Sequence, residues 1–89
     1  MPNVYRNNQL TYEYIKPIRT MRNKTQAELG KLMELDTSTV GKLERNEIQF
    51  TPFYEAKLKQ AIRRLRISQH ELYSIKTLIE YKKLRGYKG

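Results

Sequence analysis

The chain has 89 residues, and its 18 lysines and arginines outnumber its nine aspartates and glutamates to give a net charge of +9. This length holds a single domain, and the lack of cysteine together with a single histidine excludes disulfide frameworks and the usual zinc sites. No apolar run approaches the roughly 20 residues that span a bilayer, and the first residues lack the apolar stretch of a signal peptide, so we expect a cytoplasmic protein that does not use a membrane.

The first predicted elements are an arm and a short helix. Residues 1–13 carry several amide side chains and show no helical period, which predicts an N-terminal arm. A short helix is expected over residues 14–23. Pro17 lacks an N–H and would clash with the carbonyl group four residues earlier, so regular helix should begin near Lys16.

Two N-terminal caps predict the next two helices. Thr25 and Glu28 have the spacing of a capping box, in which the hydroxyl and the carboxylate each satisfy a free backbone N–H, so a helix should run over residues 26–33. Asp36 is a good N-cap, because its carboxylate can accept from the following N–H groups and meets the positive end of the helix. The second helix should then run from residue 37 to about residue 45.

Two further helices complete the predicted fold. Thr51 as N-cap and Pro52 at the first helical position open one of them. The core side of this helix carries Leu58, Ala61, Ile62 and Leu65. Ser68 and Glu71 repeat the capping-box pattern and open the last helix, which should end before Gly86. The sequence therefore predicts an all-α fold, a compact bundle of about five helices.

The two middle helices carry the pattern that bears on function. Separated by residues 34–36, they match the spacing of a helix-turn-helix, whose second helix enters the major groove of DNA. Gly30 is small where the two backbones would approach closely. The apolar side chains that two crossed helices would bury are Leu29, Met33, Leu35, Val40 and Leu43.

At these residues the sequence resembles the Cro/CI-like, or XRE, family of transcriptional regulators. The matching residues are Arg19, Thr25-Gln26-Ala27-Glu28-Leu29-Gly30, Leu35-Asp36 and Val40-Gly41-Lys42-Leu43-Glu44-Arg45-Asn46, within a region of about residues 15–68. The resemblance implies a lambda-repressor-like helix-turn-helix domain over residues 14–67, followed by a C-terminal helix and basic tail over residues 68–89. Glu34 stands where the family usually has glycine, and a left-handed backbone there costs about 1 kcal/mol. Asn46 replaces the family's closing glycine and accepts a positive φ more easily.

The resemblance also implies which side chains contact DNA. Base edges would be read from the second helix by Thr37, Ser38, Thr39 and Lys42. Phosphates would be contacted by Gln26, Lys24, Lys31 and Arg45. The plainer alternatives are that Gln26 is a solvated side chain and that Thr37 and Ser38 only help to cap the helix.

Other residues receive structural or open assignments. Arg19 and Glu44 match the family's internal ion pair, which ties the first helix to the recognition helix. A second basic group consists of Lys57, Lys59, Arg63, Arg64 and Arg66, and residues 82–89 form a basic tail. Such runs are usually solvated faces, and a second phosphate contact is the alternative. In the last helix, Leu72, Ile75 and Ile79 would pack on the domain or pair with a second subunit.

The resulting functional hypothesis is a regulator of transcription, more often a repressor in this family, that binds a near-palindromic double-stranded DNA operator as a homodimer. It implies no cofactor, no metal and no catalysis. His70 is the single histidine and has no cysteine nearby, so no nucleophile and base arrangement can be assembled around it, and we expect an exposed residue of the first turn. One alternative is an antitoxin-type protein that regulates its own operon while its C-terminal helix holds a protein partner, which an exposed apolar stripe there would favour. Another is a DNA-architectural or mobile-element accessory protein with weaker sequence preference.

Overall fold

Five α-helices follow one another through residues 10–84, the part of the chain that this computed structural model describes. They are α2 (Ile15–Met21), α3 (Gln26–Met33), α4 (Thr37–Glu44), α5 (Pro52–Arg64) and α6 (Gln69–Leu84), and the 3-10 turn η1 (Tyr12–Tyr14) leads into α2. The described residues contain no strand. The prediction of an all-α fold with about five helices is therefore confirmed.

Both predicted capping boxes are present and fix where α3 and α6 begin. The Glu28 N–H donates to the Thr25 hydroxyl at 3.1 Å, and the Thr25 N–H donates to the Glu28 carboxylate at 2.9 Å. At α6, the Glu71 N–H donates to the Ser68 hydroxyl at 3.1 Å and the Ser68 N–H donates to the Glu71 carboxylate at 2.8 Å. Each box satisfies N–H groups that the first helical turn leaves without a partner.

The caps of α4 and α5 are also the predicted ones. Asp36 accepts from the Thr39 N–H at 2.9 Å, and Thr51 accepts from the Tyr54 N–H at 3.5 Å with Pro52 at the first helical position. As a result α4 begins at the predicted residue and ends one residue before the expected Arg45. Local sequence signals thus set the starts of four of the helices.

The beginning of the domain differs from the prediction. Regular helix starts at Ile15, one residue before Lys16, so Pro17 lies in the first turn of α2, where its missing N–H leaves no gap in the helix. Leu10 is buried, and its N–H donates to the Glu55 carboxylate at 3.1 Å. Part of the expected arm is therefore packed against the core, while residues 1–9 lie outside the described residues.

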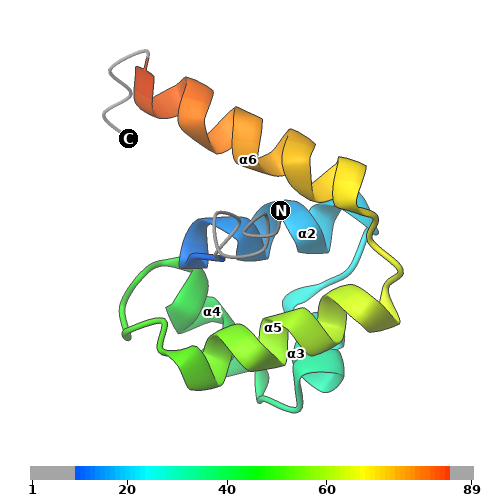
Figure 1. Ribbon diagram of the computed structural model, residues 1–89. Coiled ribbons are helices and arrows are strands. Elements are labelled where there is room, and N and C mark those ends of the chain that lie inside the picture. The colour runs from blue at the N-terminus through cyan, green and yellow to red at the C-terminus, as the bar shows by residue number, and fades with distance from the viewer. Residues whose placement is uncertain (1–9, 85–89) are drawn as a thin grey trace.

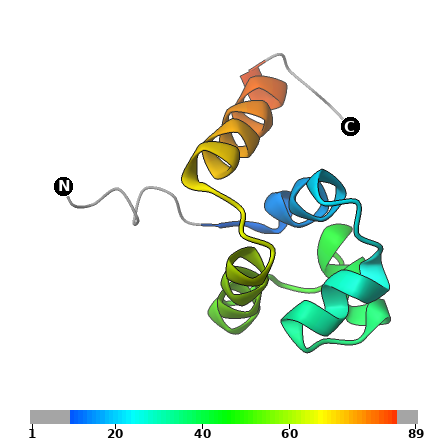
Figure 2. The same ribbon diagram turned by 90° about the vertical axis from the view of Figure 1, so that its right-hand side faces the viewer.

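One core joins all five helices. Its fully buried large side chains are Ile15, Ile18, Leu29, Met33, Val40, Leu43, Leu58 and Ile75. In Figure 1, α6 lies above α2 and α5 lies below it. Figure 2 shows α3 and α4 beside α5, on the side that is turned away from the viewer in Figure 1. In α6, Ile75 is buried and Leu72 and Ile79 pack partly against the same core, so the predicted stripe faces the domain.

Within residues 10–84, four residues that follow helices have a left-handed backbone without being glycine. They are Asn23, Glu34, Asn46 and Arg66, with φ between 55° and 61°. Asn46 behaves as predicted, and Glu34 adopts the left-handed conformation that glycine would have adopted more easily. The left-handed backbone at Glu34 costs about 1 kcal/mol relative to glycine.

Candidate nucleic-acid interface

The turn between α3 and α4 folds closely onto α3. The Leu35 N–H donates to the Gly30 carbonyl at 2.8 Å, and a Cβ on Gly30 would lie only 2.7 Å from the Leu35 carbonyl oxygen. The predicted close approach of the two backbones is therefore present, and no side chain other than hydrogen fits there. This contact places α4 beside α3.

An ion pair in a partly buried position ties α4 to α2. Arg19 Nε donates to Glu44 Oε2 at 2.7 Å, and Arg19 Nη2 donates to Oε1 of the same carboxylate at 3.1 Å. The side chains are only 15% and 7% exposed, and Arg19 Nη1 also donates to the Lys24 carbonyl at 3.1 Å. The predicted pair is present, and it turns the acidic residue of α4 toward the interior.

Gln26, a predicted phosphate contact, is oriented by this ion pair. Its Nε2 donates to Glu44 Oε1 at 3.1 Å, so the amide bridges α3 and α4. The same amide lies over Gly41, where an added Cβ would be 3.5 Å from the Gln26 Oε1. Gln26 is consequently half-buried and held in place. It is therefore not the freely solvated side chain of the plainer alternative.

The base-reading residues predicted on α4 divide into two groups. Thr37, Ser38 and Lys42 are exposed, and no ion pair within the described residues involves Lys42. Thr39 is half-buried. The pKa of Asp36 is lowered most by a hydrogen bond from the Thr39 side chain, and next by the hydrogen bond from the Thr39 backbone N–H. Thr39 therefore contributes to the helix cap, while the other three side chains face solvent.

The predicted phosphate contacts also differ among themselves. Lys31 is exposed and Lys24 is half-buried, and neither forms an ion pair within the described residues. Arg45 is exposed but pairs with Glu47, with Nε 2.7 Å from Oε2. No role was predicted for Glu47 from the sequence, although an acidic residue two positions after Arg45 is a local signal for an ion pair.

All nine acidic side chains of the chain are engaged within the molecule, in helix caps, hydrogen bonds or ion pairs. Among residues 10–84, Lys16, Lys24, Lys31, Lys42, Arg63, Arg64 and Arg66 form no ion pair. The surplus of positive charge is thus displayed on the surface, where a polyanion can reach it.

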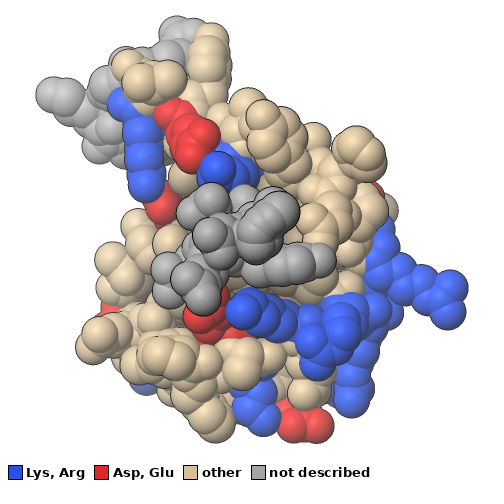
Figure 3. All heavy atoms as spheres, in the orientation of Figure 1, with Lys and Arg blue, Asp and Glu red and all other residues tan. Residues whose placement is uncertain are grey.

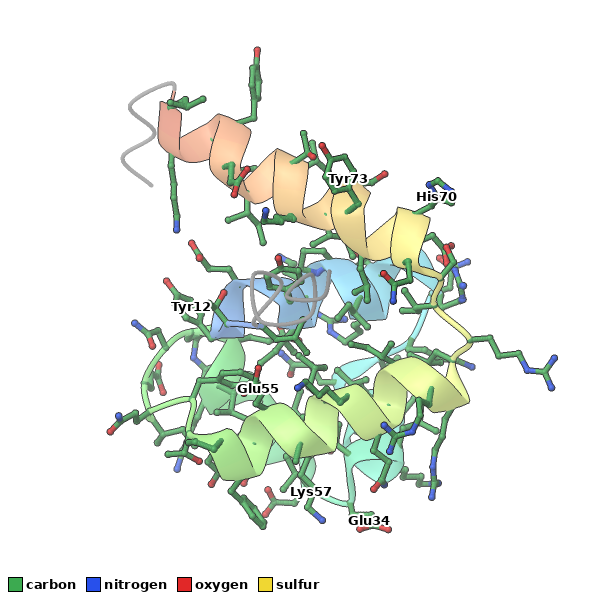
Figure 4. The ribbon with its side chains drawn as sticks, viewed as in Figure 1. Tyr12, Glu34, Glu55, Lys57, His70 and Tyr73 are labelled. Carbon is green, nitrogen blue, oxygen red and sulfur yellow. The ribbon has the colours of Figure 1, made fainter. Side chains whose placement is uncertain are left out.

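The second basic group, on and just after α5, also contains both paired and unpaired cations among the described residues. Lys57 pairs with Glu34 at 3.0 Å, and Figure 4 shows the two side chains close together where the α3–α4 turn meets α5. Lys59 pairs with Glu55 at 4.0 Å. The exposed arginines of this group are Arg63, Arg64 and Arg66. Figure 3 shows basic side chains gathered over the C-terminal end of α5, and in this view α4 lies on the far side of α5.

Ion pairs join both ends of helix α6 to the rest of the domain. Arg22 donates to both Glu71 carboxylate oxygens at 2.9 Å, and also to the carbonyl oxygens of Leu65 at 3.0 Å and Arg66 at 3.1 Å. The hydrogen bond from Arg22 and the backbone N–H of Ser68 lower the pKa of Glu71 to about 2. The sequence reasoning assigned Arg22 no role.

The other end of α6 carries part of the predicted basic tail. Lys83 pairs with Glu13 of η1 at 3.2 Å, so its charge is directed toward the domain. Residues 85–89 of the tail lie outside the described residues. The outer side of α6 exposes Tyr73, Leu78, Tyr81 and Leu84. Figure 4 shows Tyr73 and His70 pointing away from the domain.

Comparisons of the chain with protein-family models, with curated proteins and with solved structures give no significant match. Within residues 10–84, no helix combines the length and the apolar character that crossing a membrane requires. The case for function therefore depends on the residues of α3, α4 and their surroundings.

Proposed function

We propose that this protein is a sequence-specific, double-stranded DNA-binding regulator of transcription, acting as a repressor in the cytoplasm by occupying an operator. The observation that carries the proposal is the character of α4. This helix exposes Thr37, Ser38 and Lys42, whereas its own carboxylate, Glu44, is turned inward against Arg19. A short helix with donors, acceptors and a cation outward can read base edges in the major groove.

The surroundings of α4 support the same proposal. Lys31 lies on α3, Lys24 precedes it and Arg45 follows α4. Lys24 and Lys31 form no ion pair within the described residues, whereas Arg45 pairs with Glu47. Phosphate contacts of this kind position a protein on the duplex, while base contacts determine the sequence it prefers. Catalysis has no part in this mechanism.

The test is selection of a random duplex library by the purified protein, followed by titration of the enriched site. We expect a near-palindromic motif. Lys42→Ala should change the preferred base within each half-site and weaken binding to the original site about tenfold. The matched control is Lys76→Ala, which removes the same charge from α6 and should keep the motif.

Two results would count against the proposal. Binding without any enriched motif, lost equally from all duplexes as salt rises, would favour the DNA-architectural alternative. An absence of binding to every duplex at low salt would remove the DNA-binding proposal altogether.

We also propose a homodimer, and the exposed side chains of α6 are where a second copy or, in the antitoxin-type alternative, another protein would bind. Tyr73, Leu78, Tyr81 and Leu84 are exposed apolar or aromatic side chains on one helix. Exposed apolar patches on small proteins often mark contacts with other chains. Sedimentation equilibrium should report a dimer that Leu84→Glu shifts toward monomer. A monomeric wild type would favour the antitoxin-type alternative, in which this side holds another protein.

A further inference from the structure

Arg45 and Glu47 form a two-point ion pair at the C-terminal end of α4. Arg45 Nε donates to Glu47 Oε2 at 2.7 Å, and Nη2 donates to Oε1 at 3.2 Å. The backbone of Glu47 is held beside the end of α4, because Asn46 is left-handed and the Glu47 N–H donates to the Lys42 carbonyl at 2.8 Å. The two side chains are 57% and 50% exposed, so an incoming anion can reach the guanidinium.

Glu47 differs from the other carboxylate at this end of α4. Glu44 is 7% exposed and is bound by both Arg19 and Gln26, so its charge is neutralised inside the domain. Glu47 forms its only ion pair within the described residues with Arg45. Its pKa is lowered first by the hydrogen bond from Arg45 and also by the charges of Arg45 and Lys42. An ionised carboxylate therefore stands beside the two cations of α4.

Arg45 also lies beside Gln26, another of the side chains expected to contact phosphate. A Cβ on Gly41 would be 3.1 Å from Arg45 Nη1 and 3.5 Å from Gln26 Oε1. Arg45 from the end of α4 and Gln26 from the start of α3 thus meet over the bare backbone of Gly41. An anion that binds here would approach both side chains.

We infer that Glu47 is an intramolecular competitor of DNA phosphate for Arg45. This inference rests on the proposed DNA-binding function. A guanidinium binds carboxylates and phosphates through the same fork of donors, so Nε and Nη2 cannot serve Glu47 and a phosphate together. A phosphate can take the Nε–Nη2 fork of Arg45 only by displacing Glu47, and the released carboxylate then repels the DNA backbone. Glu47 consequently keeps affinity for DNA in general below the level that the cations of α4 would give alone.

The test compares Glu47→Gln with Glu80→Gln in titrations of labelled duplex at several salt concentrations. Both substitutions remove one negative charge from an exposed glutamate in an ion pair, at the end of α4 or on α6. We expect Glu47→Gln to tighten binding about two- to fivefold more than Glu80→Gln, the scale of one exposed ion pair. The slope of log affinity against log salt should steepen by up to about 0.9 in Glu47→Gln only, because Glu47 no longer competes for the Arg45 contact with one phosphate.

Arg45→Ala identifies the cation that is released. It should cost more affinity in the Glu47→Gln background than in the wild type, where the pair already restrains Arg45. Weaker binding by Glu47→Gln would overturn the inference, because Glu47 would then be orienting Arg45 toward DNA. Equal binding by the two glutamine variants would overturn it as well. If the wild type binds no duplex, the proposed function itself is contradicted. This outcome is measured on the wild type alone, so it is distinguishable from a failure of the inference.

Discussion

Helices α4 and α6 are attached to the rest of the domain in different ways. The shorter helix, α4, is anchored by a partly buried carboxylate, Glu44, which is bound from α2 by Arg19 and from α3 by Gln26. The longer helix, α6, has one fully buried side chain, Ile75, and its ends are held by ion pairs nearer to solvent.

This difference matches what each helix would do in a DNA-binding protein. A helix that reads bases must keep its side chains within a few tenths of an ångström of the productive geometry, which requires fixed supporting contacts. A helix that binds another chain needs an exposed surface, and its attachment to its own domain can be less rigid. We therefore expect changes at the anchor of α4 to affect the whole fold, and changes at the ends of α6 to have smaller effects.

The largest effect should follow from Glu44→Ala. The substitution leaves the Arg19 guanidinium, which is 15% exposed, without its counter-charge, and breaking such a pair costs about 3–5 kcal/mol. Chemical denaturation followed by circular dichroism measures the loss. Arg19→Ala with Glu44→Ala should cost less than the sum of the two single changes. A loss below about 1 kcal/mol in Glu44→Ala would mean that the pair behaves like an exposed one, and α4 would not differ from α6.

Next in size is a matched pair of substitutions on α3 and α4. In Gly30→Ala the new methyl would lie 2.7 Å from a backbone oxygen, so the turn must move, at a cost of about 1–3 kcal/mol. In Gly41→Ala the methyl would lie 3.1 Å from the flexible end of Arg45, which can shift, while alanine gains up to about 1 kcal/mol of helix propensity. Thermal unfolding should thus separate the two variants in opposite directions.

The same pair of variants distinguishes stability from binding. Gly41→Ala should bind DNA more weakly than the wild type although it is at least as stable, because its methyl separates Arg45 from Gln26. DNA titration of the folded variant measures this. Wild-type affinity in Gly41→Ala would show that the surface over Gly41 does not contact DNA.

The attachment of α6 should depend on pH. Because the folded-state pKa of Glu71 is about 2, below its ordinary value of 4.5, the contribution of this group is fully present above about pH 4.5 and is lost as pH falls toward 2. The stability difference between the wild type and Glu71→Gln should therefore narrow over this window. Urea unfolding at several pH values measures the difference, and a gap that stays constant down to pH 2 would contradict the role of the Arg22–Glu71 pair.

The sequence allowed the helices and their starts to be predicted because those signals are local. The Thr25–Glu28 box involves residues three positions apart, so its spacing can be seen without knowledge of the fold. The Arg19–Glu44 pair joins residues 25 positions apart, and only the resemblance to a family suggested it.

Other contacts depend on the tertiary arrangement and have no local signature. Arg22 meets Glu71 across 49 positions, and Lys57 meets Glu34 across 23. Leu10 is a single apolar residue in a polar stretch, so no period predicted its burial. In the candidate interface, the resemblance to a family suggested Thr37, Ser38 and Lys42, which are exposed, whereas the bridge from Gln26 to Glu44 required the placement of α3 against α4.

The smallest effect concerns Arg66, in the connection between α5 and α6. Its φ of 56° is left-handed, a conformation that glycine adopts freely, and its carbonyl oxygen accepts from Arg22 at 3.1 Å. Arg66→Gly keeps this carbonyl and should raise the free energy of unfolding by about 0.5–1 kcal/mol, measured by chemical denaturation. Arg66→Ala removes the same charge but keeps the strained backbone, so it should show no such gain. Equal stability in the two variants would mean that the connection carries no strain, and the looser attachment of α6 would then have to arise from its few buried contacts alone.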